Sequence, residues 1–476
     1  MTDLTWMDAC AQAELVRSGQ ASPAELIDAA VDRIERVNPG LNAVIHPRFD
    51  KARSEAAGPL PDGPFRGVPL LVKDLGCQTD GDPYHCGTKF LKELGWTADH
   101  DTAFVGRFRQ AGFVVVGRTN VPEFGTAITT EPASHGPARN PWNPDHSTGG
   151  SSGGTGAAVA SGMTPVAHGN DGGGSIRIPA SECGVVGLKP TRARVSQSPD
   201  VGEAWMGGTI DGVLTRTVRD TAAALDCIAG AEPGDPYPAP PLPRPLLQEV
   251  GADPGHLRVG ILDHPLLPGV SADMDSATAV ATAARLLENL GHKVEVSHPV
   301  ALQEPEFHLH FGNIVMVAMA ADLDSWSRRV GRDVTDDDIE AGNAALAAVG
   351  RSISAPAYLA SVEWMHGYQR RMARWWAEDG FDVLVSPVLN GSPPPLGWLT
   401  DPEQGMTRVL EMMQYTAQFN ITGQPAVSLP LHWTASGLPM GVQFTAAFGR
   451  EDLLIRLAAQ LEQAKPWAGR HPQVHA

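Results

Sequence analysis

Two serines in a glycine-rich segment are the residues of this chain best suited to nucleophilic chemistry. Between residues 149 and 174, ten of the 26 residues are glycine, and Ser151 and Ser175 each directly follow glycines. A serine hydroxyl is a weak nucleophile unless an adjacent base takes its proton. His168 and Asp171 also lie in this segment, but they are not interpreted as the pair of a Ser-His-Asp triad, because His168 is predicted to be a packed polar residue. The base must come from elsewhere, and Lys73, at the end of a predicted buried strand, is the candidate.

A lysine can act as this base only in its neutral form. Its pKa must therefore fall from roughly 10.4 toward the working pH. Burial without a carboxylate partner lowers the pKa of a lysine in this way. A fall of about 3 pH units corresponds to roughly 4 kcal/mol of unfavourable burial. The sequence therefore predicts that the Lys73 side chain is buried.

Three common glycine motifs do not fit the segment. A phosphate loop, G-x-x-x-x-G-K-[ST], needs a lysine after the glycines, and none follows before Lys189. A dinucleotide fingerprint needs an apolar strand before it, but the polar stretch NPDHSTGG precedes these glycines. Residues 149–153 match the G-x-S-x-G nucleophile elbow of α/β-hydrolases literally. That elbow follows a buried strand, whereas residues 141–148 contain two prolines and almost no apolar residue.

The order of motifs along the chain resembles the amidase signature family of serine hydrolases. GGSSGG is followed by DGGGSIRIPAS and GLKPT, and further matches run from Lys73-Asp74 through NPWNP to FNITGQPAVSLP at 419–430. The resemblance implies an α/β fold in which a central twisted mixed sheet is covered by helices on both faces. It also implies a Ser–cis-Ser–Lys triad, with Ser175 as nucleophile, Ser151 on a cis peptide bond as proton relay, and Lys73 as the final base.

The glycines before the nucleophile have a chemical role in such a site. Residues without a Cβ let the chain curl closely around a substrate carbonyl, so that backbone N–H groups can stabilise the oxyanion. The donors implied here are the N–H groups of Gly172, Gly173, Gly174 and Ser175. Most members of the family have threonine in place of the first of these glycines. A buried polar network is expected to support the loop, with Ser152, Asp171 and Arg177 as its members.

Substrate selection is expected to come from side chains around the triad. Segments 124–131, 197–209, 311–319 and 412–419 are rich in methionine, tryptophan and phenylalanine, which favours an apolar, adaptable pocket for uncharged substrates. The predicted substrate contacts are Gly125, Thr126, Trp205, Asn313, Met316 and Phe419. His168 is predicted to be a packed polar residue. His308 and His310 stand two apart in a helical stretch and make a poor metal site, and no metal or organic cofactor is expected.

The activity that the resemblance implies is amide hydrolysis through a covalent acyl-enzyme. The expected substrates are small uncharged linear or cyclic amides, such as nylon-like oligomers and anilides. The same proton relay can cleave carbamates, including urethanes, and esters, because only the acyl oxygen and the leaving group need recognition. Two alternatives stay open. One is the transamidating subunit of a glutamyl-tRNA amidotransferase, which shares the signature, and the other is a non-catalytic binding protein on the same scaffold.

Alternating strands and helices are predicted to position these residues. Ser22 and Pro23 begin a helix that Asn38-Pro39-Gly40 should stop. Residues 68–72 read as a buried strand that delivers Lys73, and a helix near 101–111 and a strand at 113–120 follow. Later predicted elements are strands at 257–262, 293–296 and 381–387, a helix at 273–290 and a helical region at 306–380 that lines the substrate pocket.

One amidase domain is predicted to span residues 1–476, with the signature core at about 67–195. Seven prolines between 233 and 245 predict a stiff, extended connection within it. No repeat with a period of 20–50 residues is present.

Composition excludes several partners. Lys and Arg number 36 against 54 Asp and Glu, so the net charge is −18, and no basic run that would bind nucleic acid is present.

The start of the sequence lacks an export signal, and no stretch of about 18 apolar residues predicts a membrane span. Five cysteines without a C-x-x-C pair favour reduced thiols in the cytoplasm. A homodimer is left open.

Overall fold

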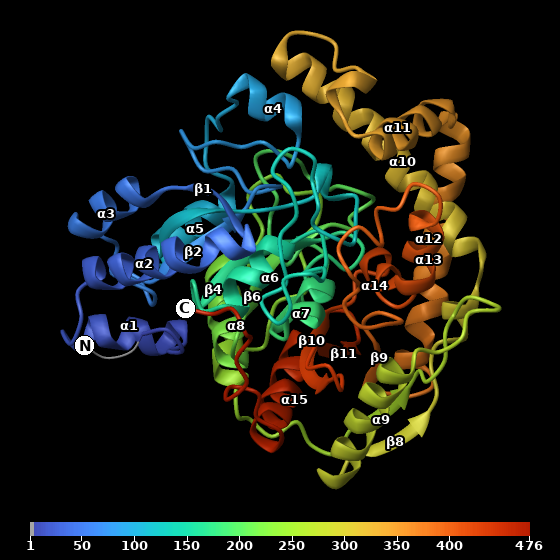
Figure 1. Cartoon of the computed structure of the whole chain (residues 1–476). Helices are drawn as coiled ribbons and strands as arrows, with labels where there is room; N and C mark the ends of the chain where they lie inside the picture. Colours follow the sequence, from blue (N-terminus) through green and yellow to red (C-terminus); the bar gives the residue numbers. More distant parts are fainter. Residues whose placement is uncertain (1–3) are drawn as a thin grey trace.

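The computed structural model describes residues 4–476 and contains one mixed sheet of eleven strands (Figure 1). The strands are β1 (Val44–Pro47), β2 (Pro69–Lys73), β3 (Val114–Thr119), β4 (Val166–Asp171), β5 (Val186–Lys189), β6 (Ile210–Thr215), β7 (Arg258–Ile261), β8 (Lys293–Val296), β9 (Val383–Pro387), β10 (Ala426–Trp433) and β11 (Pro439–Ala446). Their order across the sheet is β1-β3-β2-β4-β6-β5-β10-β11-β9-β7-β8. Strand β2 runs parallel to β3 and β4, and β7 runs parallel to β8 and β9, while the other pairs are antiparallel.

Helices cover both faces of this sheet, which confirms the predicted α/β fold class. They are α1 (Ala9–Arg17), α2 (Pro23–Leu41), α3 (Phe49–Ala57), α4 (Lys89–Leu94), α5 (Ala103–Gln110), α6 (Gly153–Ala160), α7 (Arg177–Cys183), α8 (Val218–Ile228), α9 (Met274–Asn289), α10 (Glu306–Val330), α11 (Ala341–Ser352), α12 (Ala355–Ala377), α13 (Gly405–Met412), α14 (Ala417–Ile421) and α15 (Glu451–Ala464). Leu70 and Val72 of β2 pack in a core cluster with residues of α5, α8 and α15. Leu71, between them, packs in a second cluster with residues of α2, α6 and α7.

This alternation decides where the candidate base points. Successive side chains of a strand leave opposite faces of the sheet. Lys73 is two residues after Leu71, so both lie on the face that α6 and α7 cover. Ser151 and Ser152 directly precede α6, and Ser175 lies just before α7. The sheet and the starts of two helices therefore direct the candidate residues toward one region.

Most predicted elements are present, but the helix from Pro23 does not stop at the Asn-Pro-Gly sequence. It continues to Leu41, which is fully buried and anchors the last turn in the core. Pro39 falls inside that last turn. Asn42 then ends the helix in the left-handed conformation, at φ +50°, and its N–H donates to the Asn38 carbonyl. Asparagine adopts this conformation more readily than most residues, which makes it an effective stop.

The proline-rich connection joins two parts of one sheet. No helix or strand lies between the end of α8 at Ile228 and a short 3-10 helix at Leu246–Glu249. Strand β7, which follows the connection, pairs with β9 in the same eleven-stranded sheet as β1–β6.

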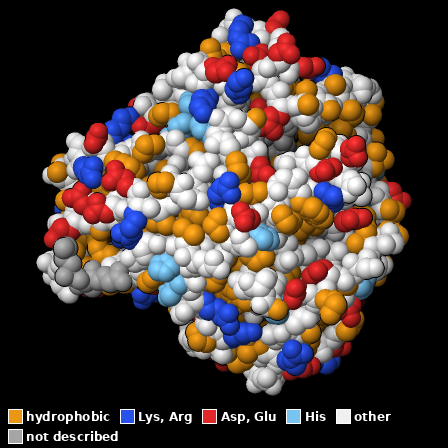
Figure 2. Space-filling model, in the orientation of Figure 1, with side chains coloured by type: hydrophobic (Ala, Val, Ile, Leu, Met, Phe, Trp, Pro, Cys, Tyr) orange, Lys and Arg blue, Asp and Glu red, His pale blue; other side chains and the backbone are white. Residues whose placement is uncertain are grey.

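The predicted helical region 306–380 consists of α10, α11 and α12, which lie together along one side of the molecule (Figure 1). Among residues 4–476, no helix is both long and apolar enough to cross a membrane. Figure 2 shows acidic and basic side chains interspersed over the face drawn, without a continuous basic surface.

Candidate active site

Lys73 is the last residue of β2, and its side chain is fully buried, as the sequence predicts. All five residues of β2 are buried because β3 and β4 pair with its two edges and helices cover both faces of the sheet. Burial lowers the pKa of Lys73 from 10.5 to about 7, since the protonated amine loses its hydration, while the charges of Asp211 and Asp171 oppose this shift. Near neutral pH, a large fraction of this lysine is therefore able to accept a proton.

The Lys73 amine contacts two polar side chains from other segments. Its Nζ lies 2.7 Å from Oγ of Ser151 and donates to Oδ1 of Asn170 at 2.6 Å. Ser151 is buried and follows a cis peptide bond from Gly150. A Cβ on Gly150 would lie 2.6 Å from the backbone nitrogen of Thr129, so only glycine fits there. The fold thus brings Lys73 and Ser151 into hydrogen-bond contact.

Asn170 is a site residue that the sequence analysis did not single out. It is the penultimate residue of β4, which runs parallel to β2, so its side chain lies beside Lys73. Its Nδ2 donates to the Leu75 carbonyl at 2.9 Å, which turns Oδ1 toward the amine. A neutral amide holds the amine without adding the negative charge that would raise the lysine pKa. The available signal was a polar residue at the end of an apolar strand, directly before DGGGS.

Ser175 lies in the turn between β4 and α7, and it is partly exposed. Its hydroxyl makes no hydrogen bond to any residue in the described range 4–476, whereas that of Ser151 is held by Lys73. Apolar groups pack directly against the glycines before it. A Cβ on Gly172 would lie 2.9 Å from the Trp205 ring, and one on Gly173 would lie 2.9 Å from Cε of Met413. Glycine is therefore required for this close approach.

The sequence predicts that the N–H of Gly174 is an oxyanion donor, but in the structure this N–H already donates to another residue of the protein. It donates to Oδ1 of Asp171 at 2.7 Å, and the N–H of Ile176 donates to Oδ2 of the same carboxylate at 3.1 Å. A donor bonded to a buried carboxylate is not free to stabilise a substrate oxyanion. The candidate donors that remain are the N–H groups of Gly172, Gly173 and Ser175.

Asp171 and Arg177 form a fully buried ion pair beneath this turn. Nε and Nη2 of the guanidinium donate to the two carboxylate oxygens at 2.9 and 2.8 Å. Burial alone would raise the pKa of Asp171, but the charge and hydrogen bonds of Arg177 lower it well below its usual range. Asn420, from the FNITGQPAVSLP segment, accepts from Arg177 at 2.6 Å and donates to Asp171 at 2.8 Å. Ser152 is separate from this pair, since its hydroxyl donates to the carbonyl of Asn170 at 3.2 Å.

His168 is buried on β4 and supports the backbone at Lys73. Its Nε2 lies 3.0 Å from Oδ1 of Asp211, and its ring stacks on Phe104 with centroids 4.9 Å apart. The backbone N–H of Lys73 donates to its Nδ1 at 3.4 Å. This arrangement agrees with the interpretation of His168 as a packed polar residue.

Three predicted substrate contacts lie near the candidate triad, although one of them is engaged elsewhere. A Cβ on Gly125 would lie 3.1 Å from Oγ of Ser151, so this glycine borders the site. Trp205 packs against the glycine turn, as described above. The hydroxyl of Thr126 instead donates to Oδ1 of Asn343 at 2.6 Å, which ties this segment to α11.

Of the other three predicted contacts, Asn313 and Phe419 are engaged through their side chains and Met316 through its backbone. Asn313 and Met316 lie half-buried on α10; Nδ2 of Asn313 donates to Oγ of Ser361 on α12 at 3.1 Å. The carbonyl of Met316 faces Gly350 of α11, where a Cβ would lie only 1.9 Å away. Phe419 is 1% exposed and belongs to a core cluster. The expectation that Phe419 contacts substrate does not fit this structure, because the side chain has no surface left for a ligand.

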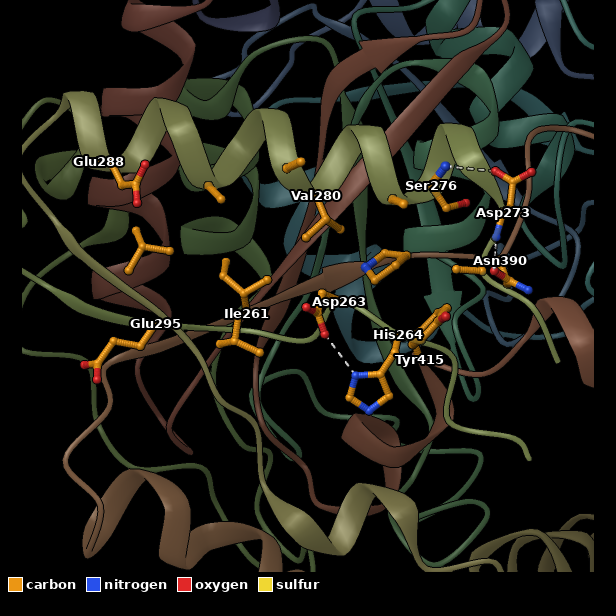
Figure 3. Close-up of a pocket in the computed structure, with 17 residues that line it drawn as sticks. Ile261, Asp263, His264, Asp273, Ser276, Val280, Glu288, Glu295, Asn390 and Tyr415 are labelled. Carbon is orange, nitrogen blue, oxygen red and sulfur yellow. Dashed lines mark hydrogen bonds and ion pairs between the residues drawn. The ribbon is translucent and has the colours of Figure 1, made fainter. Parts of the chain in front are cut away.

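The cavity in Figure 3 lies elsewhere on the molecule. It has a volume of about 320 Å³ between α9 and strands β7, β8 and β9. Its one lining serine, Ser276, donates to the Leu389 carbonyl at 3.1 Å, and neither a lysine nor any of the three candidate triad residues lines it. His264 also lines it and lies 2.9 Å from Asp263, but no hydrogen bond joins His264 to Ser276 within residues 4–476. The candidate active site is therefore the region around Lys73, where a serine hydroxyl contacts a base.

Comparison with known proteins gives the same class of enzyme as the fold and the contact between Lys73 and Ser151 indicate, an amidase. The family model described as Amidase matches residues 25–455, and the chain belongs to this family. It is a hydrolase that acts on carbon–nitrogen amide bonds.

Two relatives are named 6-aminohexanoate-cyclic-dimer hydrolase, from Paenarthrobacter ureafaciens and from Pseudomonas sp. (strain NK87). Each is 46% identical over 480 residues, which cover 98% of this chain and 97% of the relative. The solved structure of 6-aminohexanoate cyclic dimer hydrolase complexed with substrate is 45% identical, with a TM-score of 0.95 over 99% of this chain and 100% of the other.

A solved glutamyl-tRNA(Gln) amidotransferase structure, from Thermotoga maritima, is a more distant match. It is 26% identical, with a TM-score of 0.80 over 100% of this chain and 99% of the other. The likeness to the cyclic-dimer hydrolases is thus stronger in both sequence and structure.

Proposed function

We propose that this chain hydrolyses uncharged linear or cyclic amides through an acyl-enzyme on Ser175, with Ser151 as proton relay and Lys73 as base. The observation that carries the proposal is the 2.7 Å contact between the Ser151 hydroxyl and a buried amine whose pKa falls to about 7. Two relatives named for hydrolysis of a cyclic amide, each aligned over nearly the whole chain, support this substrate class.

The proposed reaction moves one proton along the relay and back. Lys73 takes the proton of Ser151, which takes that of Ser175 as its oxygen attacks the amide carbonyl. The N–H groups of Gly172 and Gly173, with that of Ser175, stabilise the oxyanion. The proton then returns through the relay to the leaving amine, which departs and leaves an ester on Ser175. Water attacks this ester by the same route and releases the acid.

Carbamates and esters are proposed as further substrates of the same steps. Attack, oxyanion stabilisation and protonation of the leaving group involve only the acyl oxygen and the leaving atom. The surroundings of the glycine turn are apolar, since Trp205 and Met413 pack against it and Phe311 lies edge-on to Trp205 with centroids 6.4 Å apart. Such walls favour uncharged substrates, because an ionised group would lose its hydration there.

The proposal is tested with an aryl amide, an aryl ester and an aryl carbamate, each followed by the absorbance of the arylamine or phenol that it releases. Ser175→Ala should lower kcat/KM for the amide by at least roughly 10³-fold, and Lys73→Ala should lower it by roughly 10²–10⁴-fold. Ser276→Ala, which removes a buried serine far from the site, is the matched control and should stay active. Full amidase activity in Ser175→Ala would overturn the proposal, and an ester-only wild type would overturn the amide assignment.

A further inference from the structure

Three histidines that are far apart in the sequence converge on one point near the edge of the sheet. His46 lies on β1, His85 in the loop between β2 and α4, and His135 in the loop that precedes α6. Each offers a ring nitrogen, and these three atoms all lie within 4.8 Å of one another. The ring centroids are 4.4 Å apart for His46 and His85, 5.2 Å for His46 and His135, and 6.1 Å for His85 and His135. These residues are called the histidine cluster below.

The cluster is enclosed, yet its ring nitrogens lack hydrogen-bond partners. His85 is 6% exposed, and neither of its ring nitrogens makes a hydrogen bond of ordinary distance and angle, although the Trp96 backbone lies close enough to oppose the lowering of its pKa by burial. Nε2 of His46 and Nε2 of His135 are also buried without a partner within residues 4–476. Buried polar atoms in folded proteins nearly always have a partner, so several unpaired nitrogens that face one another point to a ligand that they share.

The ring nitrogens suit a metal ion, because imidazole is a common zinc ligand. Two cations, Lys92 and Arg118, lie close enough to act on the cluster. Arg118 is buried 4.0 Å from the carboxylate of Asp74, whose charge opposes its own. Lys92 is exposed, so solvent screens its repulsion of a bound cation.

The segments that carry the cluster are held in place by other contacts. β1 pairs with β3 along the sheet. The carboxylate of Asp74 accepts from the N–H of His85 at 3.1 Å. The hydroxyl of Ser134, next to the third histidine, donates to the Gly87 carbonyl at 2.6 Å and ties the two loops together. A site whose ligands are already positioned loses little conformational entropy when it binds an ion.

We propose that His46, His85 and His135 bind a zinc ion. Zinc–nitrogen distances are about 2.0–2.1 Å, which places the ligand atoms of a tetrahedral site roughly 3.4 Å apart. Small rotations of rings whose nitrogens already lie within 4.8 Å of one another reach this separation. Oδ2 of Asp74 lies 4.0 Å from Nε2 of His46, where a carboxylate can accept a hydrogen bond from a zinc-bound water.

The zinc site is distinct from the candidate active site. Asp74 directly follows Lys73, but the amine of Lys73 contacts Ser151, whereas the Asp74 carboxylate contacts the backbone of His85. A zinc ion would therefore link β1 and two loops around the end of β2, and we expect it to stabilise the fold. This proposal departs from the expectation of no metal site, because spacing along the sequence does not reveal a cluster assembled from three distant segments.

The test measures zinc binding itself, so it is independent of hydrolysis. The untagged chain is stripped with a chelator, and zinc is titrated in competition with a chromophoric chelator while bound metal is measured by atomic emission. His85→Ala and the less buried His135→Ala probe the cluster, and His366→Ala, an exposed histidine on α12, is the matched control. Mg²⁺, which prefers oxygen ligands, replaces zinc in a parallel titration.

We expect one zinc ion per chain in the wild type and in His366→Ala, and no Mg²⁺ binding. Each cluster variant should bind zinc at least 10–100-fold more weakly, since even loss of a group that only supports a ligand costs that much. Co²⁺ in the wild type should give the visible absorption of a tetrahedral site. Equal zinc affinity in the wild type and in His135→Ala would overturn the proposal, as would a wild type that binds no zinc at micromolar concentrations.

Discussion

Replacing Lys73 with methionine should nearly abolish hydrolysis and, at the same time, stabilise the folded chain. Methionine retains an unbranched apolar side chain of similar length but has no amine to accept a proton. The proposed relay then has no final base, and kcat should fall roughly 10²–10⁴-fold, which is the contribution expected of a positioned general base.

The gain in stability follows from the burial of the amine. Burial lowers the pKa of Lys73 from 10.5 to about 7, and at 1.36 kcal/mol per pH unit this corresponds to a cost of about 5 kcal/mol. The substitution removes that cost. It also leaves Ser151 and Asn170 without the amine as a hydrogen-bond partner, which lowers the free energy of unfolding by about 1–3 kcal/mol. The free energy of unfolding should therefore rise by about 2–4 kcal/mol at pH 7.

The burial of Lys73 also predicts how the free energy of unfolding of the wild type changes with pH. Between pH 7 and 10.5 the unfolded lysine keeps its proton while the folded one has lost it, so the unfolded state binds more protons and wild-type stability rises with pH. Below about pH 7 both states are protonated at this residue, and its cost stays at its maximum. Because the methionine variant lacks this group, its advantage should shrink by about 2 kcal/mol between pH 7 and pH 9.

Urea denaturation at pH 7 and pH 9, together with amide hydrolysis at pH 8, tests this reasoning. Lys189→Met is the matched control, because Lys189 is also buried and burial also lowers its pKa to about 7. Within residues 4–476, its Nζ donates to the Pro190 carbonyl alone. That variant should gain similar stability and retain most of its activity. A Lys73→Met enzyme that hydrolyses amides at the wild-type rate, or that is less stable than wild type at pH 7 while the control is more stable, would refute the reasoning.

Three further substitutions probe the surroundings of the relay. Asn170→Asp places a carboxylate beside the amine, so it should raise the Lys73 pKa and move the acid limb of the kcat/KM profile up by about 1–3 pH units; an unmoved limb would contradict the lysine-base role. Gly125→Ala should lower kcat about 10²-fold, because φ at this position is +70° and the new Cβ would lie 3.1 Å from Oγ of Ser151. A variant with unchanged kcat would show that a side chain at this position does not crowd Ser151. Arg177→Met leaves a buried carboxylate unpaired and should reduce the free energy of unfolding by about 3–5 kcal/mol, measured by urea denaturation; a loss below about 1 kcal/mol would show that the pair is dispensable.

Parts of this structure follow directly from the sequence. The apolar run before Lys73 predicts a buried strand, and alternation along β2 places the amine on the face of α6 and α7. The glycines around Ser151 and Ser175 indicate a close approach of the backbone, which the crowding at Gly150 and Gly173 bears out.

Other features depend on contacts between distant segments, which sequence spacing does not encode. Asn170 reaches Lys73 only because β4 pairs with β2, and Asp171 is held under the glycine turn by Asn420, which is 249 residues away. Phe419 is an aromatic residue of the kind expected in a pocket wall, but its helix packs it into the core. Composition predicts that such a side chain is apolar and buried, not whether a cavity or another residue covers it.

The covalent acyl-enzyme is the central claim, and rapid-quench mass spectrometry of the intact chain tests it most directly. The enzyme is mixed with an aryl ester or aryl amide whose acyl group forms a slowly hydrolysed ester, quenched in acid, and digested to locate the added mass. We predict an adduct equal to the acyl group on Ser175, formed before steady state and missing from Ser175→Ala. Product release at the full rate without any adduct, or an adduct on Ser151 instead, would contradict the account.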